Sequence, residues 1–269
     1  MSRSQSRPRL AHLRTARRVW AVATIHAEAR LLIALHDRLS DCFQAGDRVV
    51  YLGNYLGYGE AVHATLGELL DFRRRIIGRL AGFACDAVFL RGAQEEMWQK
   101  LLQLQFAPNP GEVLEWLAQA GIEPTVRAYG GDLRQGFAAA RGGPHTITRW
   151  TAALRDAMNA APGHTMLLST LRHAAFTDRG GVLFVHAAVA RSRPFQAQGD
   201  AFWWGRDDIL ALDAPFDGFC RVVRGVDRDR RGLVERPFAV SLDSGAGYGG
   251  PLSAACFDRD GSIIDRIDS

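Results

Sequence analysis

The sequence has few of the residues that build common metal and redox motifs. Its four cysteines, Cys42, Cys85, Cys220 and Cys256, lie far apart and include no CxxC pair. This spacing argues against a zinc ribbon or a redox motif, and it predicts reduced thiols in the protein core. Lysine is nearly absent, because Lys100 is the only one. Such arginine-rich usage is typical of a GC-rich genome, so we expect a bacterial protein.

Long hydrophobic runs are missing as well. No apolar segment approaches the roughly 18 residues that a membrane-spanning helix requires. The start of the chain, MSRSQSRPRLAHLRTARR, lacks the apolar segment of a signal peptide. We therefore expect a cytoplasmic protein that does not contact the membrane.

Acidic residues are absent from residues 1–18, which carry six arginines. A segment so poor in apolar residues cannot bury enough surface to order itself, which predicts a disordered basic arm. The chain has a formal net charge of +4, so removing these six charges leaves the rest at −2. The folded body is then not a basic surface, and we expect an anionic partner such as nucleic acid to bind only through the arm.

The chain is long enough for one large core, because its 269 residues have 47% hydrophobic content. We expect a single domain over residues 19–269. Strand-like runs at 19–25, 47–52 and 86–90 alternate with amphipathic segments near 28–40 and 60–82, which predicts a parallel sheet with crossover helices.

The remainder of the chain changes character twice. Residues 106–165 are predicted to form a loop-rich helical insertion that caps the sheet. Strand-like runs then dominate, at 173–177, 181–189, 220–225, 237–245, 253–258 and 262–267. A parallel half followed by a strand-rich half favours an α/β sandwich, with two packed sheets and helices outside.

Polar and glycine-rich segments follow the first three expected strands. They read ATIHA (23–27), GNYLGYG (53–59) and RGAQEE (91–96). Because ligands bind at the carboxyl ends of strands in open α/β sheets, we expect the functional site at these segments.

These segments resemble motifs of the calcineurin-like metallophosphoesterases, in particular the serine/threonine protein phosphatase and diadenosine tetraphosphatase branch. That family shows GDxHG, GDxxDRG and GNHE after its first three strands, and later HAG, GHT and D-x-G-x-x-GG. The later segments here read HAA (186–188), RGVD (224–227) and LDSGAGYGG (242–250). The resemblance covers residues 19–258. It implies a metallophosphoesterase-like sandwich of two mixed β-sheets flanked by helices, with a helical cap insertion.

The resemblance also implies where two metal ions would lie. In the family they polarise the phosphate and activate a water molecule. The former metal-site positions in this chain are Thr24, His26, Asn54, Ala93, His186 and Val226. Only the two histidines keep the family's residue, although neighbouring divalent cations need anionic ligands to neutralise their repulsion. We therefore expect no metal cofactor, or at most a single weakly bound divalent transition metal between His26 and His186.

The residue at the family's general-acid position also differs from the family's. Gln94 stands where the family has its catalytic histidine, and a glutamine cannot donate a proton as an imidazolium can. The Asp and Arg of DRG align with Gly57 and Tyr58. We therefore expect a catalytically degenerate pseudophosphatase.

A pseudophosphatase would bind rather than hydrolyse. Arg91, Arg221 and Arg224 are the candidate anion-binding residues, which predicts a phosphate-containing ligand or a protein partner. One alternative is a divergent active phosphoesterase that hydrolyses phosphoprotein or nucleotide phosphoesters. It would hold two Mn, Fe or Zn ions through the two histidines and acids such as Glu28, Glu95 or Asp243. Another is a purely structural interaction module.

Overall fold

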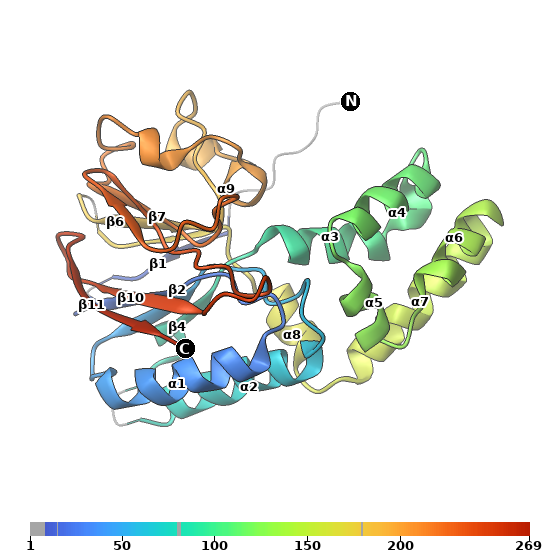
Figure 1. Ribbon diagram of the computed structural model, residues 1–269, viewed down its shortest axis with the longest axis horizontal. Helices are drawn as coiled ribbons and strands as arrows, with labels where there is room; N and C mark the ends of the chain where they lie inside the picture. Colours follow the sequence, from blue (N-terminus) through green and yellow to red (C-terminus); the bar gives the residue numbers. More distant parts are fainter. Residues whose placement is uncertain (1–8, 15, 80–81, 179) are drawn as a thin grey trace.

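The computed structural model describes residues 9–14, 16–79, 82–178 and 180–269. These residues form two mixed β-sheets stacked on each other, with helices on the outer faces (Figure 1). The expected sandwich of two mixed sheets flanked by helices is confirmed.

The first sheet is built on parallel strands from the first hundred residues. Strands β2, β3 and β4 are parallel neighbours, whereas β10 runs antiparallel to both β2 and β11. Every residue of β2 is buried, as expected for a strand covered on both faces. The strand order is β11 (Ile263–Asp268), β10 (Ser253–Phe257), β2 (Val19–Val22), β3 (Arg48–Tyr51), β4 (Ala87–Phe89).

The second sheet comes mainly from the last hundred residues. Its parallel pairs are β1–β5, β6–β7 and β7–β9, and its antiparallel pairs are β5–β6 and β8–β9. The strand order is β1 (Leu10–His12), β5 (Ala174–Phe176), β6 (Val182–Val185), β7 (Arg221–Arg224), β9 (Ala239–Ser241), β8 (Val234–Arg236).

Helices α1 (Ala29–Cys42) and α2 (Val62–Ile77) cover the outer face of the first sheet, at the bottom of Figure 1. α1 buries Leu32, Leu35 and Leu39, whose spacing of three and four residues forms one apolar face. α9 (Ala201–Trp204) lies on the second sheet, at the top of Figure 1. No helix in the described part of the chain is long and apolar enough to cross a membrane.

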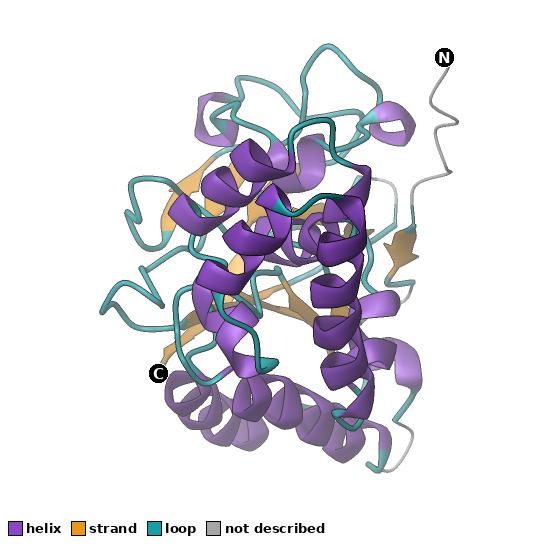
Figure 2. Ribbon diagram, turned by 90° about the vertical axis from the view of Figure 1, so that its right-hand side faces the viewer, coloured by secondary structure: helices purple, strands orange, loops and turns teal. Residues whose placement is uncertain are grey.

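The region between the two halves is helical. Figure 2 shows its helices in front of the sheets. Asn109 and Asp132 cap two of these helices by accepting hydrogen bonds from backbone N–H groups of the first turn. The helices are α3 (Ala93–Leu102), α4 (Pro110–Gln119), α5 (Glu123–Ala128), α6 (Leu133–Arg141), α7 (Pro144–Ala160) and α8 (His164–Ser169). Short 3-10 turns lie at Ala84–Asp86, Leu104–Phe106, Phe195–Ala197 and Ile209–Ala211.

The N-terminal segment corrects one expectation. Residues 1–8 of the predicted disordered arm lie outside the described residues. Among the described residues of its second half, 9–14 and 16–18, β1 pairs with β5 and the side chains of Leu13 and Ala16 are buried. The prediction of a disordered arm over 1–18 is therefore wrong from β1 onward.

The cysteines correct a second expectation. All four are free thiols, but only Cys256 is buried and Cys85 is exposed. The prediction of core thiols therefore holds for one of the four.

Candidate functional site

Loops after strands of both sheets meet in one place. Nδ1 of His186, after β6, donates a hydrogen bond of 2.6 Å to the carbonyl of Leu52, after β3. The backbone N–H of Thr24, after β2, lies 3.4 Å from the carbonyl of Gly225, after β7. At Gly53 an added Cβ would lie 2.9 Å from Nδ1 of His186, so only glycine fits this close approach. The structure thus assembles the strand-end motifs into one site.

His26 and Asn54 face each other at the ends of β2 and β3. Asn54 Oδ1 accepts the backbone N–H of Gln94 at 3.0 Å, so its amide nitrogen is the group 3.4 Å from Nε2 of His26. Nδ1 of His26 is buried without a hydrogen-bond partner among the described residues. Burial lowers the pKa of His26 to about 3, with the nearby His186 ring and the Arg230 charge acting in the same direction. This ring is therefore neutral at pH 7.

His186 is also buried and neutral. Its Nδ1–H is donated to Leu52, so Nε2 carries the lone pair, and this atom has no partner among the described residues. Burial lowers the pKa of His186 to about 4. His186, Asn54, Ala93 and Val226 line one cavity of about 310 Å³. Four of the six predicted metal-site positions thus share a cavity.

Gln94 and Glu95 are both engaged by the backbone. Nε2 of Gln94 donates to the carbonyl of Ala120 in the helical insertion at 2.8 Å. The Glu95 carboxylate accepts four backbone N–H groups at 2.8–3.1 Å, those of Asn54, Tyr55, Leu56 and Gly92. Burial raises the pKa of Glu95 even though these hydrogen bonds favour the ionised form. Each oxygen already has two donors, so Glu95 holds the loop after β3 in place.

The three candidate anion-binding arginines are not brought together. Arg91 pairs with Glu96 at 2.7 Å, and Arg221 pairs with Glu235. Arg221 and Arg224 stand at opposite ends of β7. Of the three, Arg224 alone is among the described residues that line the cavity. The prediction of one pocket built by all three is therefore wrong, because neighbouring carboxylates hold two of them elsewhere.

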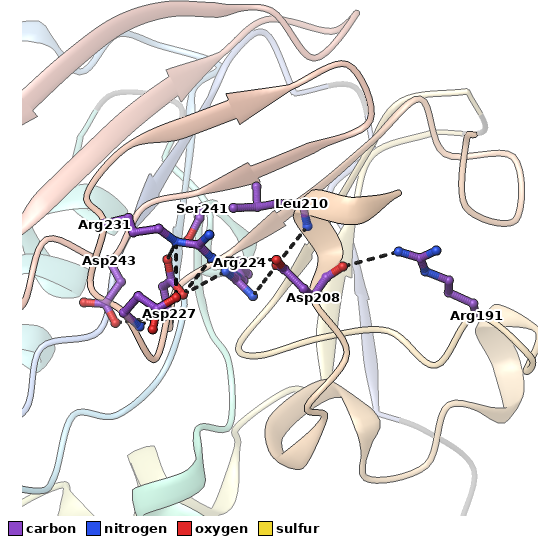
Figure 3. A network of polar contacts seen from close by, with 9 residues as sticks. Arg191, Asp208, Leu210, Arg224, Asp227, Arg231, Ser241 and Asp243 are labelled. Atoms are coloured by element: carbon purple, nitrogen blue, oxygen red, sulfur yellow. Dashed lines mark hydrogen bonds and ion pairs between the residues drawn. The ribbon is translucent and has the colours of Figure 1, made fainter. Parts of the chain in front are cut away.

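An ion-pair network centred on the buried Arg224 and Asp227, which the sequence did not reveal, lines the same cavity (Figure 3). The side chain of Arg224 is 7% exposed and lies 3.0 Å from Asp227 and 3.4 Å from Asp208. Its Nε donates to Oγ of Ser241 at 3.1 Å. Arg231 donates to both carboxylate oxygens of Asp227, at 2.7 and 3.1 Å. The alternating charges in RGVDRDRR (224–231) could have indicated this network from the sequence, because a carboxylate at a buried strand end needs a charged partner.

The charges on the cavity wall balance. Burial disfavours the ionised form of Asp227, but the hydrogen bond from Arg231 and the charge of Arg224 outweigh it and lower the pKa. The described lining residues with formal charge are four arginines and four aspartates: Arg206, Arg224, Arg228, Arg231, Asp207, Asp208, Asp227 and Asp229. The site is therefore not a simple basic pocket.

The donor atoms at this site do not match what two divalent cations require. The side-chain atoms without a hydrogen-bond partner at the strand ends are guanidinium nitrogens of Arg91 and Arg224, which cannot bind a cation, and neutral atoms, with no carboxylate oxygen among those described. The neutral atoms are Thr24 Oγ1, His26 Nδ1, His186 Nε2 and Gln94 Oε1. Asp227 is bound by arginines, and Asp243 accepts the N–H groups of Asp227 and Gly245. Across the described ranges, no group of three or more His, Cys, Asp or Glu residues is placed to hold a metal ion. Closely spaced divalent cations need several anionic oxygens, and these are not offered here.

Two stacked mixed sheets with outer helices, and a site built from the loops after their strands, define the sandwich of the metallophosphoesterases. No protein-family model and no curated protein matches the sequence. Among solved structures, one assigned as a diadenosine tetraphosphatase is 23% identical with a TM-score of 0.55, over 97% of this chain and 98% of that chain. A protein serine/threonine phosphatase from Saccharomyces cerevisiae is 10% identical with a TM-score of 0.52, over 98% of this chain and 83% of that chain. The calcineurin-like metallophosphoesterase fold that the motifs indicated is thus confirmed.

Proposed function

We propose that this protein is a pseudophosphatase, which keeps the metallophosphoesterase fold, lacks two-metal hydrolysis and binds a phosphate-containing ligand. The observation that carries the proposal is the neutral donor set at the strand ends. The guanidinium group of Arg224 lines the cavity where the family would place cations. Arg224 is paired with Asp227 and Asp208, so these two carboxylates are already engaged and are not free to bind a cation.

Two features of the cavity and the comparisons with solved structures support an anionic ligand. Arg206 and Arg228 line it and are exposed, so they can turn toward a ligand. Ala93 also lines it and is the first residue of α3, a ten-residue helix whose N-terminus favours negative charge. The names of the two similar structures, a diadenosine tetraphosphatase and a serine/threonine phosphatase, also support a phosphate group. This group would be free or carried by a protein partner.

An active phosphoesterase with two Mn, Fe or Zn ions is the alternative. It would need acids beside His26 and His186, but Glu95 and Asp243 already accept backbone N–H groups. The contacts around these acids therefore favour the binding protein. A single transition metal between the two histidines is the weaker form of the same alternative.

Metal analysis and phosphate titration test the proposal. We expect protein purified without a metal-chelating tag to carry far less than two equivalents of metal, and to hydrolyse aryl phosphates at background rate with added manganese. Near-stoichiometric dinuclear metal with manganese-dependent turnover would refute the pseudophosphatase.

Calorimetry with inorganic phosphate tests the ligand separately. We expect Arg206→Gln to weaken phosphate binding about tenfold, the loss of roughly one charge-assisted hydrogen bond. Arg221→Gln is the matched control, because Arg221 lies outside the cavity and pairs with Glu235. Equal affinities of the two variants, or no binding at low salt, would refute the phosphate ligand.

A further inference from the structure

A second cavity, of about 620 Å³, lies at the side of the sandwich between β1, β4, α2 and α8. Its lining residues and those of the cavity at the strand ends do not overlap. Apolar side chains line it, and Leu70, Val88, Phe89 and Leu167 are at most 8% exposed. The volume falls within the roughly 300–1,000 Å³ typical of small-molecule sites.

Three arginines line the same cavity without a carboxylate partner. Arg14, Arg73 and Arg172 make no side-chain ion pair within the described residues, and no Asp or Glu lines the cavity there. The adjacent Arg74 shows the contrast, because it pairs with Asp71 at 2.6 Å. The residues outside the described ranges, 1–8, 15, 80–81 and 179, include no acidic residue in the sequence. Asp178 lies outside the lining, 2.7 Å from Nε2 of His12. Arg14 also borders another cavity, whose lining includes Asp178 and Asp258. Within the lining itself, the positive charge around the apolar floor has no carboxylate counterpart among the described residues.

We propose that this cavity binds a small amphipathic anion, with its apolar chain on the buried floor and its carboxylate or phosphate group on the arginines. Charge complementarity selects the anionic head, because arginine forms charge-assisted hydrogen bonds with both groups. Because the apolar floor is buried, the cavity fits a single free amphipathic molecule rather than a membrane surface. A flat lipid surface cannot reach side chains that are almost fully covered, whereas a single chain can enter the recess. This inference does not depend on the proposed function of the strand-end site.

Cys85 supplies a direct readout of occupancy. It lines the cavity and is exposed, whereas Cys42 and Cys220 are half-buried elsewhere on the fold. Decanoate below its micellar concentration should slow the reaction of Cys85 with a thiol reagent and leave Cys220 unaffected. Decanol, which has the same chain without the charge, should protect at least tenfold less well, since one charge-assisted contact changes affinity by about that factor.

A matched pair of variants tests the arginines. Arg73→Gln should weaken decanoate binding about tenfold in calorimetry, while Arg74→Gln, one position along the same helix, should leave it unchanged. Decyl phosphate should bind the wild type as decanoate does. Absence of Cys85 protection, equal binding of decanol and decanoate, or equal effects of the two variants would overturn the proposal. Binding to anionic vesicles without protection by free decanoate would also overturn it.

Discussion

Replacing Arg224 by methionine should destabilise the protein strongly at neutral pH. The guanidinium group is 7% exposed, and the Asp227 carboxylate that it neutralises is 3% exposed. Removing one partner of a buried ion pair costs about 3–5 kcal/mol, because the other charge stays buried. Arg231 still holds Asp227, so we expect a smaller cost than this, about 2–4 kcal/mol. For a chain of this length this corresponds to a melting temperature lower by roughly 5–12 °C.

The loss should also depend on pH with a defined sign. The folded pKa of Asp227 is lowered. Its contribution to the free energy of unfolding is therefore present above the unfolded pKa of about 3.9, and it is lost as pH falls through the folded pKa. Arg224→Met raises the folded pKa and removes part of this contribution. The difference in melting temperature between wild type and variant should be largest near pH 7 and smaller near pH 3.5.

Thermal melts followed by circular dichroism at both pH values provide the assay. Arg221→Met is the control on the same strand, because its partner Glu235 is 47% exposed and an exposed pair contributes only about 0–1 kcal/mol. A melting temperature of Arg224→Met within 1 °C of the control at pH 7 would refute the reasoning. So would a loss of equal size at pH 3.5.

Three other perturbations test buried polar groups and the N-terminal strand. Glu95→Ala leaves four backbone N–H groups without their acceptor, so it should lower the free energy of unfolding in urea by at least about 3 kcal/mol, and Glu95→Gln should lower it less. Equal losses in the two variants would contradict the role of Glu95 in holding the loop after β3. Because the folded pKa of His186 is lowered, its contribution to the free energy of unfolding is full above the unfolded pKa of about 6.5 and falls toward pH 4. His186→Gln should therefore flatten the dependence of this free energy on pH over that range. An unchanged dependence on pH would contradict a buried neutral ring. Deleting residues 1–13 removes β1 and Leu13, so it should lower the melting temperature by several degrees relative to deletion of residues 1–8. Equal melting temperatures would show that the pairing of β1 with β5 does not stabilise the fold.

The sequence predicted the strands that carry continuous apolar runs. VWAV (19–22) and RVVY (48–51) form β2 and β3 within the expected ranges, because both are buried on both faces. β1 and β8 were not predicted. Each has three residues, and β1 exists only through pairing with β5, about 160 residues away in the chain. Pairing over such a separation leaves no local periodicity to detect.

The site was predictable where motifs fix positions and unpredictable where tertiary contacts decide partners. His26, Asn54 and His186 were found because the segments that hold them resemble the family's motifs, and the structure brings these loops together. The pairing of Arg224 with Asp208 depends on how the loop after α9 folds back, which no spacing in the sequence encodes. Grouping Arg91, Arg221 and Arg224 by their charge alone was wrong, because the sequence does not show which carboxylate each arginine pairs with.

The Arg224–Asp227 network bears on the proposed lack of two-metal hydrolysis at this site. Two cations need a surrounding excess of anionic ligands, whereas an arginine–aspartate network neutralises itself. A single carboxylate introduced at Thr24, which is fully buried, would stand among neutral donors and lack a cation of its own. Its ionised form would be desolvated, and its pKa would rise until it was neutral. Under the proposed function, one added carboxylate would therefore not create a metal site, because it would be neutral in the folded protein.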